Sequence, residues 1–424
     1  MSQFRFDYYS FDSETGIASF KYILPNGQHC EETITFSNTQ EYHLELLDRA
    51  LALAFIVIGT SYYKTFPTAT VDLGDIALDE WQANFFSHVY QEGLGQYAFE
   101  NSLTRDNLAH FVATTTESRA ATDLVLGNGI IALQSGGKDS LLTAQLLEDA
   151  NTQFTPWYVT NSGSHPAILD TLKQPLVVAR RAIDHSALKN AAAQGGKNGH
   201  VPVTYIVQSL ALIQAVLSGA NTVLVSIAHE GEEPHAFIGD LPVAHQWSKT
   251  WQAEQDFAEY VRRYISPSLR IGSPLRQFSE RRVSDLFVER AWARFGHAFS
   301  SCNEANYRQN EDNSQLKWCG HCPKCANAYL LFSPTVPAQE LQSLFDGKDL
   351  FAKPILTETF KGLLGIDGVM KPFECIGEID ELRAAYHGAQ NKGEYAALPF
   401  EVPASEFDDR HEYPSQEWAR TLVS

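Results

Sequence analysis

Residues 135–140, Ser-Gly-Gly-Lys-Asp-Ser, are of the types that bind a polyphosphate. The two adjacent glycines allow a tight turn and leave backbone N–H groups open to phosphate oxygens. Lys138 adds a positive charge, Ser135 and Ser140 can donate hydrogen bonds, and Asp139 can hold a hydrated Mg²⁺ that the phosphates share. The alternative is a Ser/Gly turn that binds nothing, but the complete set of polar groups favours phosphate binding.

The residues on either side predict a strand and a helix that would position this loop. The apolar run Ile130–Leu133 precedes it and is typical of a buried parallel strand. Apolar residues at helical spacing follow over 141–147, and the positive end of that helix would face the anion. The loop lacks the four residues that a Walker motif has between its Gly and its Gly-Lys. It resembles the pyrophosphate loop of the ATP pyrophosphatases, which cleave ATP to AMP and pyrophosphate and commonly adenylate a substrate.

Four cysteines fall within a short segment and have the spacing of metal ligands. Cys302, Cys319, Cys322 and Cys325 form the pattern C-x16-C-x2-C-x2-C. Four protein ligands leave no open position for catalysis, which favours a structural Zn²⁺. An iron–sulfur cluster and a redox pair are the alternatives.

A second group of titratable residues follows the predicted strand 221–229. In a parallel sheet, ligands bind beyond the carboxyl ends of the strands, so His229 and Glu230 are expected to lie near a substrate. His245 and Lys249 are four residues apart and would share one face if the segment is helical. These four residues are candidate proton donors and acceptors. The alternative is a solvated acidic loop followed by an amphipathic helix.

The order of the predicted elements indicates an α/β protein of several domains. The segments 154–163, 175–183, 201–207 and 221–229 read as strands alternating with helices, which predicts a parallel sheet with right-handed crossovers. Segments 4–11, 17–24 and 29–36 read as a strand meander, with a helix over 41–59, a strand over 68–73 and a helix over 79–93. We therefore predict an N-terminal α+β domain (1–120), an ATP-binding α/β domain of the pyrophosphatase type (121–295), a zinc knuckle (296–335) and a C-terminal extension (336–424) that ends in a peripheral polar tail.

Composition narrows the functional classes. The 424 residues carry a formal net charge of −19, which disfavours a broad nucleic-acid surface or an anionic membrane surface as partner. The longest apolar run, Leu51–Gly59, is too short to span a bilayer, and the first residues show no signal pattern. We expect a cytoplasmic protein that acts on a small molecule.

Several segments together are similar to the ATP-dependent UDP-N-acetylmuramoyl-L-alanyl-L-glutamate epimerases of peptidoglycan synthesis. Besides the phosphate loop, they are FRFDYYSF with GIASFKYIL, GTSYYKT, HQWSKTWQAE, WCGHCPKCANAYLLF and KPFECIGEIDELRAAY. The resemblance implies conversion of the terminal L-glutamate of UDP-MurNAc-L-Ala-L-Glu to D-glutamate, with release of AMP and pyrophosphate. Adenylation removes the charge of the carboxylate and lets its carbonyl accept the electrons of an α-carbanion.

The resemblance also implies roles for individual residues. Pyrophosphate would be held by Ser135, Gly136, Gly137, Lys138 and Ser140, and Mg²⁺ by Asp139. The acid and base stay open among His229, Glu230, His245, Lys249 and Cys375. Cys375 could equally be a small buried apolar residue.

Two other functions compete with this interpretation. A nucleobase- or tRNA-modifying enzyme such as a 7-cyano-7-deazaguanine synthase also combines a pyrophosphate loop with a cysteine knuckle, although the negative charge disfavours tRNA. A nucleotide-sensing protein with an inactive loop is disfavoured because every polar group that the loop needs is present.

Overall fold

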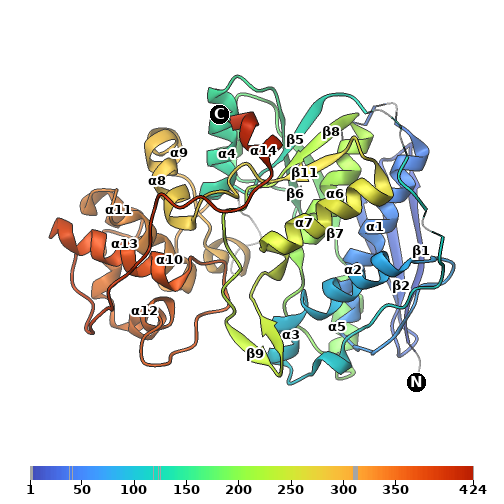
Figure 1. Ribbon diagram of the computed structural model, residues 1–424, viewed down its shortest axis with the longest axis horizontal. Coiled ribbons are helices and arrows are strands. Elements are labelled where there is room, and N and C mark those ends of the chain that lie inside the picture. Colours follow the sequence, from blue (N-terminus) through green and yellow to red (C-terminus); the bar gives the residue numbers. More distant parts are fainter. Residues whose placement is uncertain are drawn as a thin grey trace.

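The computed structural model describes residues 3–37, 39–40, 42–117, 119–122, 124, 126–308 and 314–423. A lobe built on a large sheet is joined to a smaller helical lobe from the C-terminal part of the chain (Figure 1). The predicted helix start at residue 41, and residues 309–313 of the predicted cysteine region, lie outside the described residues.

The sheet of the larger lobe has the strand order β11-β8-β5-β6-β7-β3-β2-β1-β4. The first five strands in this order pair in parallel, β7, β3, β2 and β1 pair antiparallel, and β4 runs parallel to β1. The predicted α/β class with a large, mostly parallel sheet is confirmed. The strands are β1 (Phe4–Asp12), β2 (Ile17–Ile23), β3 (His29–Thr35), β4 (Val71–Asp72), β5 (Gly129–Leu133), β6 (Thr155–Thr160), β7 (Val177–Ala182), β8 (Ala220–Leu224) and β11 (Arg270–Gly272). The hairpin β9 (Ala236–Ile238) and β10 (Leu241–Val243) stands apart.

The N-terminal meander belongs to the same sheet as the strands that follow residue 120. Strand β3 pairs with β7, with Thr33 opposite Ala182. Next to this junction the buried Arg181 guanidinium donates to the buried Glu32 carboxylate at 2.6 Å. The division into domains at residue 120 stays a prediction, and the backbone hydrogen bonds of the sheet run across it.

Helices cover the two faces of the sheet through separate apolar clusters. One cluster joins a first set of helices to the sheet: α1 (Leu44–Tyr63), α2 (Glu80–Gln91), α3 (Gly95–Glu100), α5 (His185–Ala193), α6 (Val203–Leu217) and α7 (Trp251–Tyr260). The other cluster lies on the opposite face and continues into the helical lobe. Its helices are α4 (Lys138–Asp149), α8 (Glu280–Arg290), α9 (Trp292–Phe295), α10 (Pro323–Phe332), α11 (Ala338–Ser343), α12 (Thr357–Leu364), α13 (Ile379–Lys392) and α14 (Glu417–Arg420). Within the described residues, no helix is long and apolar enough to cross a membrane.

The predicted strand over 201–207 is wrong, because helix α6 begins at Val203. Its residues are apolar almost all round, and α6 packs both on the sheet and on α1. A helix buried on opposite sides loses the polar stripe that would distinguish it from a strand, and only its length of 15 residues identifies it.

The C-terminal tail is not peripheral. In Figure 1 it runs in dark red from the helical lobe back across the molecule to α14, beside α4. The Gln416 side chain donates to the Glu254 carboxylate and to the Ile271 carbonyl, both at 3.0 Å. The tail therefore contacts the edge strand β11 and helix α7.

Candidate active site

The predicted phosphate loop connects β5 to α4, and its two serines accept hydrogen bonds from backbone N–H groups of the same loop. The Ser140 hydroxyl accepts from the backbone N–H of Ser135 at 3.2 Å, and the Ser135 hydroxyl accepts from Gly137 N–H at 3.3 Å. Gly136 has a φ of 78°, and a Cβ there would lie 2.6 Å from the Leu316 side chain. The positive φ therefore favours glycine at this turn, and the Leu316 side chain of the cysteine region packs directly against it. No side chain in the described part of the chain caps α4, which favours the availability of its first N–H groups to an anion.

Lys138 of this loop lies buried between two carboxylates. Its ammonium is 2.6 Å from Asp139 Oδ1 and 2.5 Å from Glu280 Oε2 at the start of α8. Burial opposes the charge on Lys138, but the two carboxylates together hold its pKa above the ordinary lysine value. Burial raises the pKa of Glu280 to about 7, with Asp139 and Glu230 adding to the effect and Lys138 opposing it.

A central chamber of about 40 Å³ joins this loop to the helical lobe. Its charged and polar lining comes from both lobes: Lys138, Asp139, Glu230, Lys249, Glu280, Ser301, Trp318, Lys324, Asn327 and Cys375. The chamber has room for water-sized groups only. A nucleotide or a peptide can therefore enter only if side chains from the two lobes move apart.

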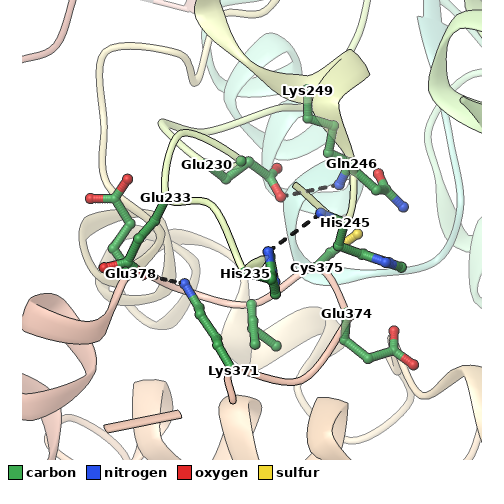
Figure 2. Close-up of a pocket in the computed structure, with 12 residues that line it drawn as sticks. Glu230, Glu233, His235, His245, Gln246, Lys249, Lys371, Glu374, Cys375 and Glu378 are labelled. Atoms are coloured by element: carbon green, nitrogen blue, oxygen red, sulfur yellow. Dashed lines mark hydrogen bonds and ion pairs between the residues drawn. The ribbon is translucent and has the colours of Figure 1, made fainter. Parts of the chain in front are cut away.

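Three of the candidate acid and base residues form a wall between this chamber and a second pocket. Glu230, Lys249 and Cys375 line both cavities. In Figure 2 Lys249 points at Glu230, and its ammonium lies 3.2 Å from Glu230 Oε2. Burial raises the pKa of the Cys375 thiol, although Lys249 and Lys324 pull it the other way. Cys375 is therefore a neutral thiol that has a proton to give.

His245 lines the second pocket, and its hydrogen bonds identify which ring nitrogen carries the proton. The Gln96 side chain donates from Nε2 to Glu100 Oε1 at 2.7 Å, which turns its Oε1 towards His245 Nδ1 at 2.7 Å. Nδ1 must therefore be the donor, and Nε2 is left with a lone pair. Burial, with His200 and Lys324 adding to it, holds the pKa of His245 well below the ordinary value. The resting imidazole is neutral and can accept a proton.

The predicted helical relation between His245 and Lys249 is wrong. Lys249 ends a short 3₁₀ turn (Trp247–Lys249), and α7 begins only at Trp251. The Thr250 side chain accepts from Ala253 N–H at 3.2 Å and so caps α7 after both residues. Both side chains nevertheless line the second pocket (Figure 2).

His229 lies outside the linings of both cavities as the described residues form them. Its ring stacks on Tyr413 of the C-terminal tail, and its Nε2 lies 3.6 Å from Glu378 Oε1. Burial, with Arg276 and His411 adding to it, lowers the pKa of His229 to about 4. Among the five candidates, His229 is the one that lines neither of the two cavities.

The four predicted metal ligands gather at one point. All four sulfurs lie within 4.8 Å of one another, with Sγ–Sγ distances of 3.6 Å for Cys302–Cys322 and Cys322–Cys325 and 3.7 Å for Cys319–Cys325. Thiolates at about 2.3 Å from a tetrahedral Zn²⁺ would be about 3.8 Å apart. The cluster therefore fits one zinc ion, which would hold the chain at Cys302 to the start of α10.

Sequence reasoning missed several residues of the site. Glu280, Gln96 and Tyr413 are far along the chain from the residues they contact and belong to no motif. Lys324 did carry a signal, since it lies between two metal ligands and must be held wherever the metal holds them.

Known protein families and curated proteins match this chain over almost its whole length. The MurL N-terminal domain matches residues 1–273, and the MurL C-terminal domain matches residues 298–411. The chain is similar to the UDP-N-acetyl-alpha-D-muramoyl-L-alanyl-L-glutamate epimerase of Xanthomonas oryzae pv. oryzae, with 30% identity over 93% of this chain and 87% of that protein. It is also similar to the protein of the same name from Salinispora tropica, with 32% identity over 90% of this chain and 83% of that protein.

Proposed function

The chain belongs to the MurL family of UDP-N-acetyl-alpha-D-muramoyl-L-alanyl-L-glutamate epimerases, and we propose on that premise that it epimerises the terminal glutamate of UDP-MurNAc-L-Ala-L-Glu. The observation that carries this proposal is the similarity to epimerases over about nine-tenths of the chain. The resemblance that we drew from the sequence is thereby confirmed. The product with D-glutamate would serve peptidoglycan synthesis.

We further propose that the reaction uses ATP and passes through an acyl-adenylate. The substrate carboxylate would attack the α-phosphate, and pyrophosphate would leave. The α-proton would then be removed and returned on the opposite face, and water would release AMP and the D-glutamyl product. Support comes from the loop over 135–140, which ends at an uncapped helix and carries Lys138 and Asp139 into the central chamber. Asp139 would hold Mg²⁺ there, with Ser135, Gly136, Gly137, Lys138 and Ser140 around the pyrophosphate.

The reason for adenylation is electrostatic. A free carboxylate resists a second negative charge at its α-carbon, whereas the mixed anhydride is neutral at the carbonyl and can accept that charge as an enolate. Positive groups placed in advance around the carbonyl oxygen lower the barrier further, because they need no reorganisation during the reaction. Lys249 lines the chamber close to Cys375 and is one such group.

We propose Cys375 and His245 as the two groups that exchange protons with the α-carbon. Cys375 is a neutral thiol in the wall of the chamber, and His245 has a free lone pair on Nε2 in the adjoining pocket. One group that holds a proton and one that can accept a proton is the pairing that inversion at carbon needs. Lys249 and Glu230, between them, would set the charge around the reacting carbon.

The proposal is tested by incubating the full chain with ATP, Mg²⁺ and UDP-MurNAc-L-Ala-L-Glu. AMP is assayed, and the glutamate released by acid hydrolysis is analysed on a chiral column. We expect AMP and D-glutamate to form together and neither to form without ATP. D-Glutamate without ATP would overturn the adenylate mechanism, and AMP with unchanged L-glutamate would overturn the epimerase assignment.

A further inference from the structure

Three lysines line the central chamber, and they differ in their partners. Lys138 is paired with Asp139 and Glu280, and Lys249 is paired with Glu230. Lys324 has no carboxylate partner among the residues that the structure describes. Its ammonium donates to the backbone carbonyl of Cys375 at 2.8 Å. An ammonium has three donors, so Lys324 retains hydrogen-bonding capacity and an uncompensated charge for an anion in the chamber.

The cysteine cluster and α10 fix the position of this lysine. Lys324 follows Pro323 in the first turn of α10, between the ligands Cys322 and Cys325. Proline at the first helical position pre-forms the turn, and the positive end of the helix dipole adds to the charge of the ammonium. The lysine therefore reaches the chamber from a backbone that the helix and the cysteine cluster both hold.

Two further donors from the same region line the chamber beside Lys324. Asn327 lies one helical turn later, and its Oδ1 accepts from Gly377 N–H at 3.0 Å, which leaves its amide nitrogen to donate. The indole Nε1 of Trp318 is buried and has no hydrogen-bond partner among the described residues. An ammonium, an amide and an indole N–H from one segment form a set of donors suited to carboxylate or enolate oxygens.

We propose that Lys324 is a substrate-binding residue that holds the α-carboxylate of the terminal glutamate and then neutralises the oxygen of its enolate. This inference rests on the proposed epimerase function. The hydrogen bond to the Cys375 carbonyl places Lys324 beside the proposed proton donor, and the carboxyl carbon is one bond away from the α-carbon that exchanges the proton. The phosphates would be served by Lys138, which belongs to the phosphate loop itself.

A matched control residue contacts the cysteine loop from a later part of the helical lobe. Lys353 donates from its ammonium to the Gly320 carbonyl at 2.7 Å, so it also makes one hydrogen bond to a backbone carbonyl in this region. It is absent from the described linings of the central chamber and of the second pocket. Lys353→Met therefore removes a comparable side chain and bond without removing charge from the chamber.

The experiment measures binding by calorimetry to the full chain and to Lys324→Met, Lys324→Arg and Lys353→Met, each checked for zinc content and thermal midpoint. The ligands are UDP-MurNAc-L-Ala-L-Glu, its analogue with an α-carboxamide on the terminal residue, and the Mg²⁺ complex of an ATP analogue blocked between the α- and β-phosphates. We expect wild type to prefer the carboxylate to the carboxamide at least tenfold. Lys324→Met should lose that preference, whereas Lys324→Arg and Lys353→Met should keep most of it.

Binding of the nucleotide analogue separates the two possible anions. It should be unchanged in Lys324→Met if the lysine holds the carboxylate. A Lys324→Met variant that keeps the full preference for the carboxylate, or that loses affinity for the nucleotide analogue instead, would overturn the inference while leaving the epimerase assignment in place. Failure of the wild-type chain to bind the UDP-linked dipeptide would count against the epimerase assignment itself.

Discussion

The imidazole of His229 lies flat against the phenol ring of Tyr413, with the ring centroids 3.6 Å apart and the ring planes 8° from parallel. The two residues are 184 positions apart, and the contact exists because the C-terminal tail crosses the end of the segment that continues β8. Tyr413 is held there by its backbone N–H, which donates to the Gln277 carbonyl at 3.0 Å. The tail thus shields from water a histidine that the sequence had placed among the candidate bases.

We predict that Tyr413→Ala raises the pKa of His229 from about 4 towards its ordinary value of 6.5, because water regains access to the imidazolium. The measurement is a pH titration of the His229 ring signals by NMR. Tyr413→Phe keeps the stacked ring and should leave the pKa of His229 near 4. An unchanged pKa in Tyr413→Ala would show that the tail is not what shields the imidazole.

Buried histidines should make the protein less stable as the pH falls. Burial lowers the pKa of His200, His229 and His235 to about 4, below the ordinary value of 6.5. Between pH 6.5 and pH 4 the unfolded chain binds protons that the folded chain does not bind. The free energy of unfolding therefore has its full value above pH 6.5. It decreases as the pH falls towards 4, by on the order of 3 kcal/mol for each of these histidines.

Urea unfolding at pH 7.5, 6.5 and 5.5 checks this slope. In His235→Gln the free energy of unfolding should decrease less with falling pH, by about the contribution of one histidine. A variant of the exposed His297 should show the same pH dependence as the wild type. A free energy of unfolding that stays constant from pH 7.5 to 5.5 in the wild type would contradict the prediction.

Lys138→Ala and Asp139→Ala should each lower the rate of AMP formation by about 100-fold or more while the fold is retained. The reason is that both groups would face the charge that develops on the phosphates and Mg²⁺. Lys173→Ala is the control, because Lys173 is an exposed lysine paired with Glu148 in the same lobe. Turnover near the wild-type level in either loop variant would refute the phosphate-loop assignment.

We expect one zinc ion for each chain, held by Cys302, Cys319, Cys322 and Cys325. Elemental analysis of freshly purified protein measures it, and Cys322→Ser should lose the metal and lower the thermal midpoint. Cys30→Ser is the matched control, since Cys30 is a buried cysteine of β3 far from the cluster. Iron with inorganic sulfide in place of zinc would identify the alternative kind of centre.

Exchange of the substrate α-hydrogen with solvent deuterium should require both ATP and Mg²⁺. An ATP analogue blocked between the α- and β-phosphates should give no exchange, because no acyl-adenylate can form from it. Cys375→Ala and His245→Asn should still form AMP but return L-glutamate, whereas His229→Asn should epimerise at close to the wild-type rate. Mass spectrometry of the recovered substrate provides the measurement, and exchange without nucleotide would exclude adenylation as the activating step.

Patterns in the sequence predicted those elements whose residue types and spacing follow from their own burial or chemistry. The strands β1 to β3 alternate apolar and polar residues because one face of the meander is buried and the other is exposed to solvent. The gathering of the four cysteines was predicted because metal binding needs particular residues at fixed short spacings. Phosphate binding by the loop over 135–140 was drawn from the same kind of pattern and stays a prediction. Helix α6 was missed because burial on opposite sides removes the periodicity on which the prediction depends.

Contacts between segments that are far apart in the sequence could not be predicted, because no short pattern of residues indicates them. Nothing in β3 indicates that its partner is β7, about 150 residues later, rather than another strand. Glu280 is the first residue of an ordinary amphipathic helix, and only the folded chain shows that its carboxylate meets Lys138. Gln96 contacts His245 from α3, a short helix that the sequence analysis did not predict.

The pairing of β3 with β7 limits how this protein can be taken apart. A fragment that starts at residue 121 would keep the parallel strands but leave the edge of β7 open, and open edges recruit other strands into aggregates. It would also leave Arg181 buried without the Glu32 carboxylate, and removing one partner of a buried ion pair typically costs about 3–5 kcal/mol. The first 273 residues are accordingly matched by a single family domain that spans the meander and the parallel strands together. Gene fusion, domain shuffling or recombinant dissection can therefore move this sheet only as a whole.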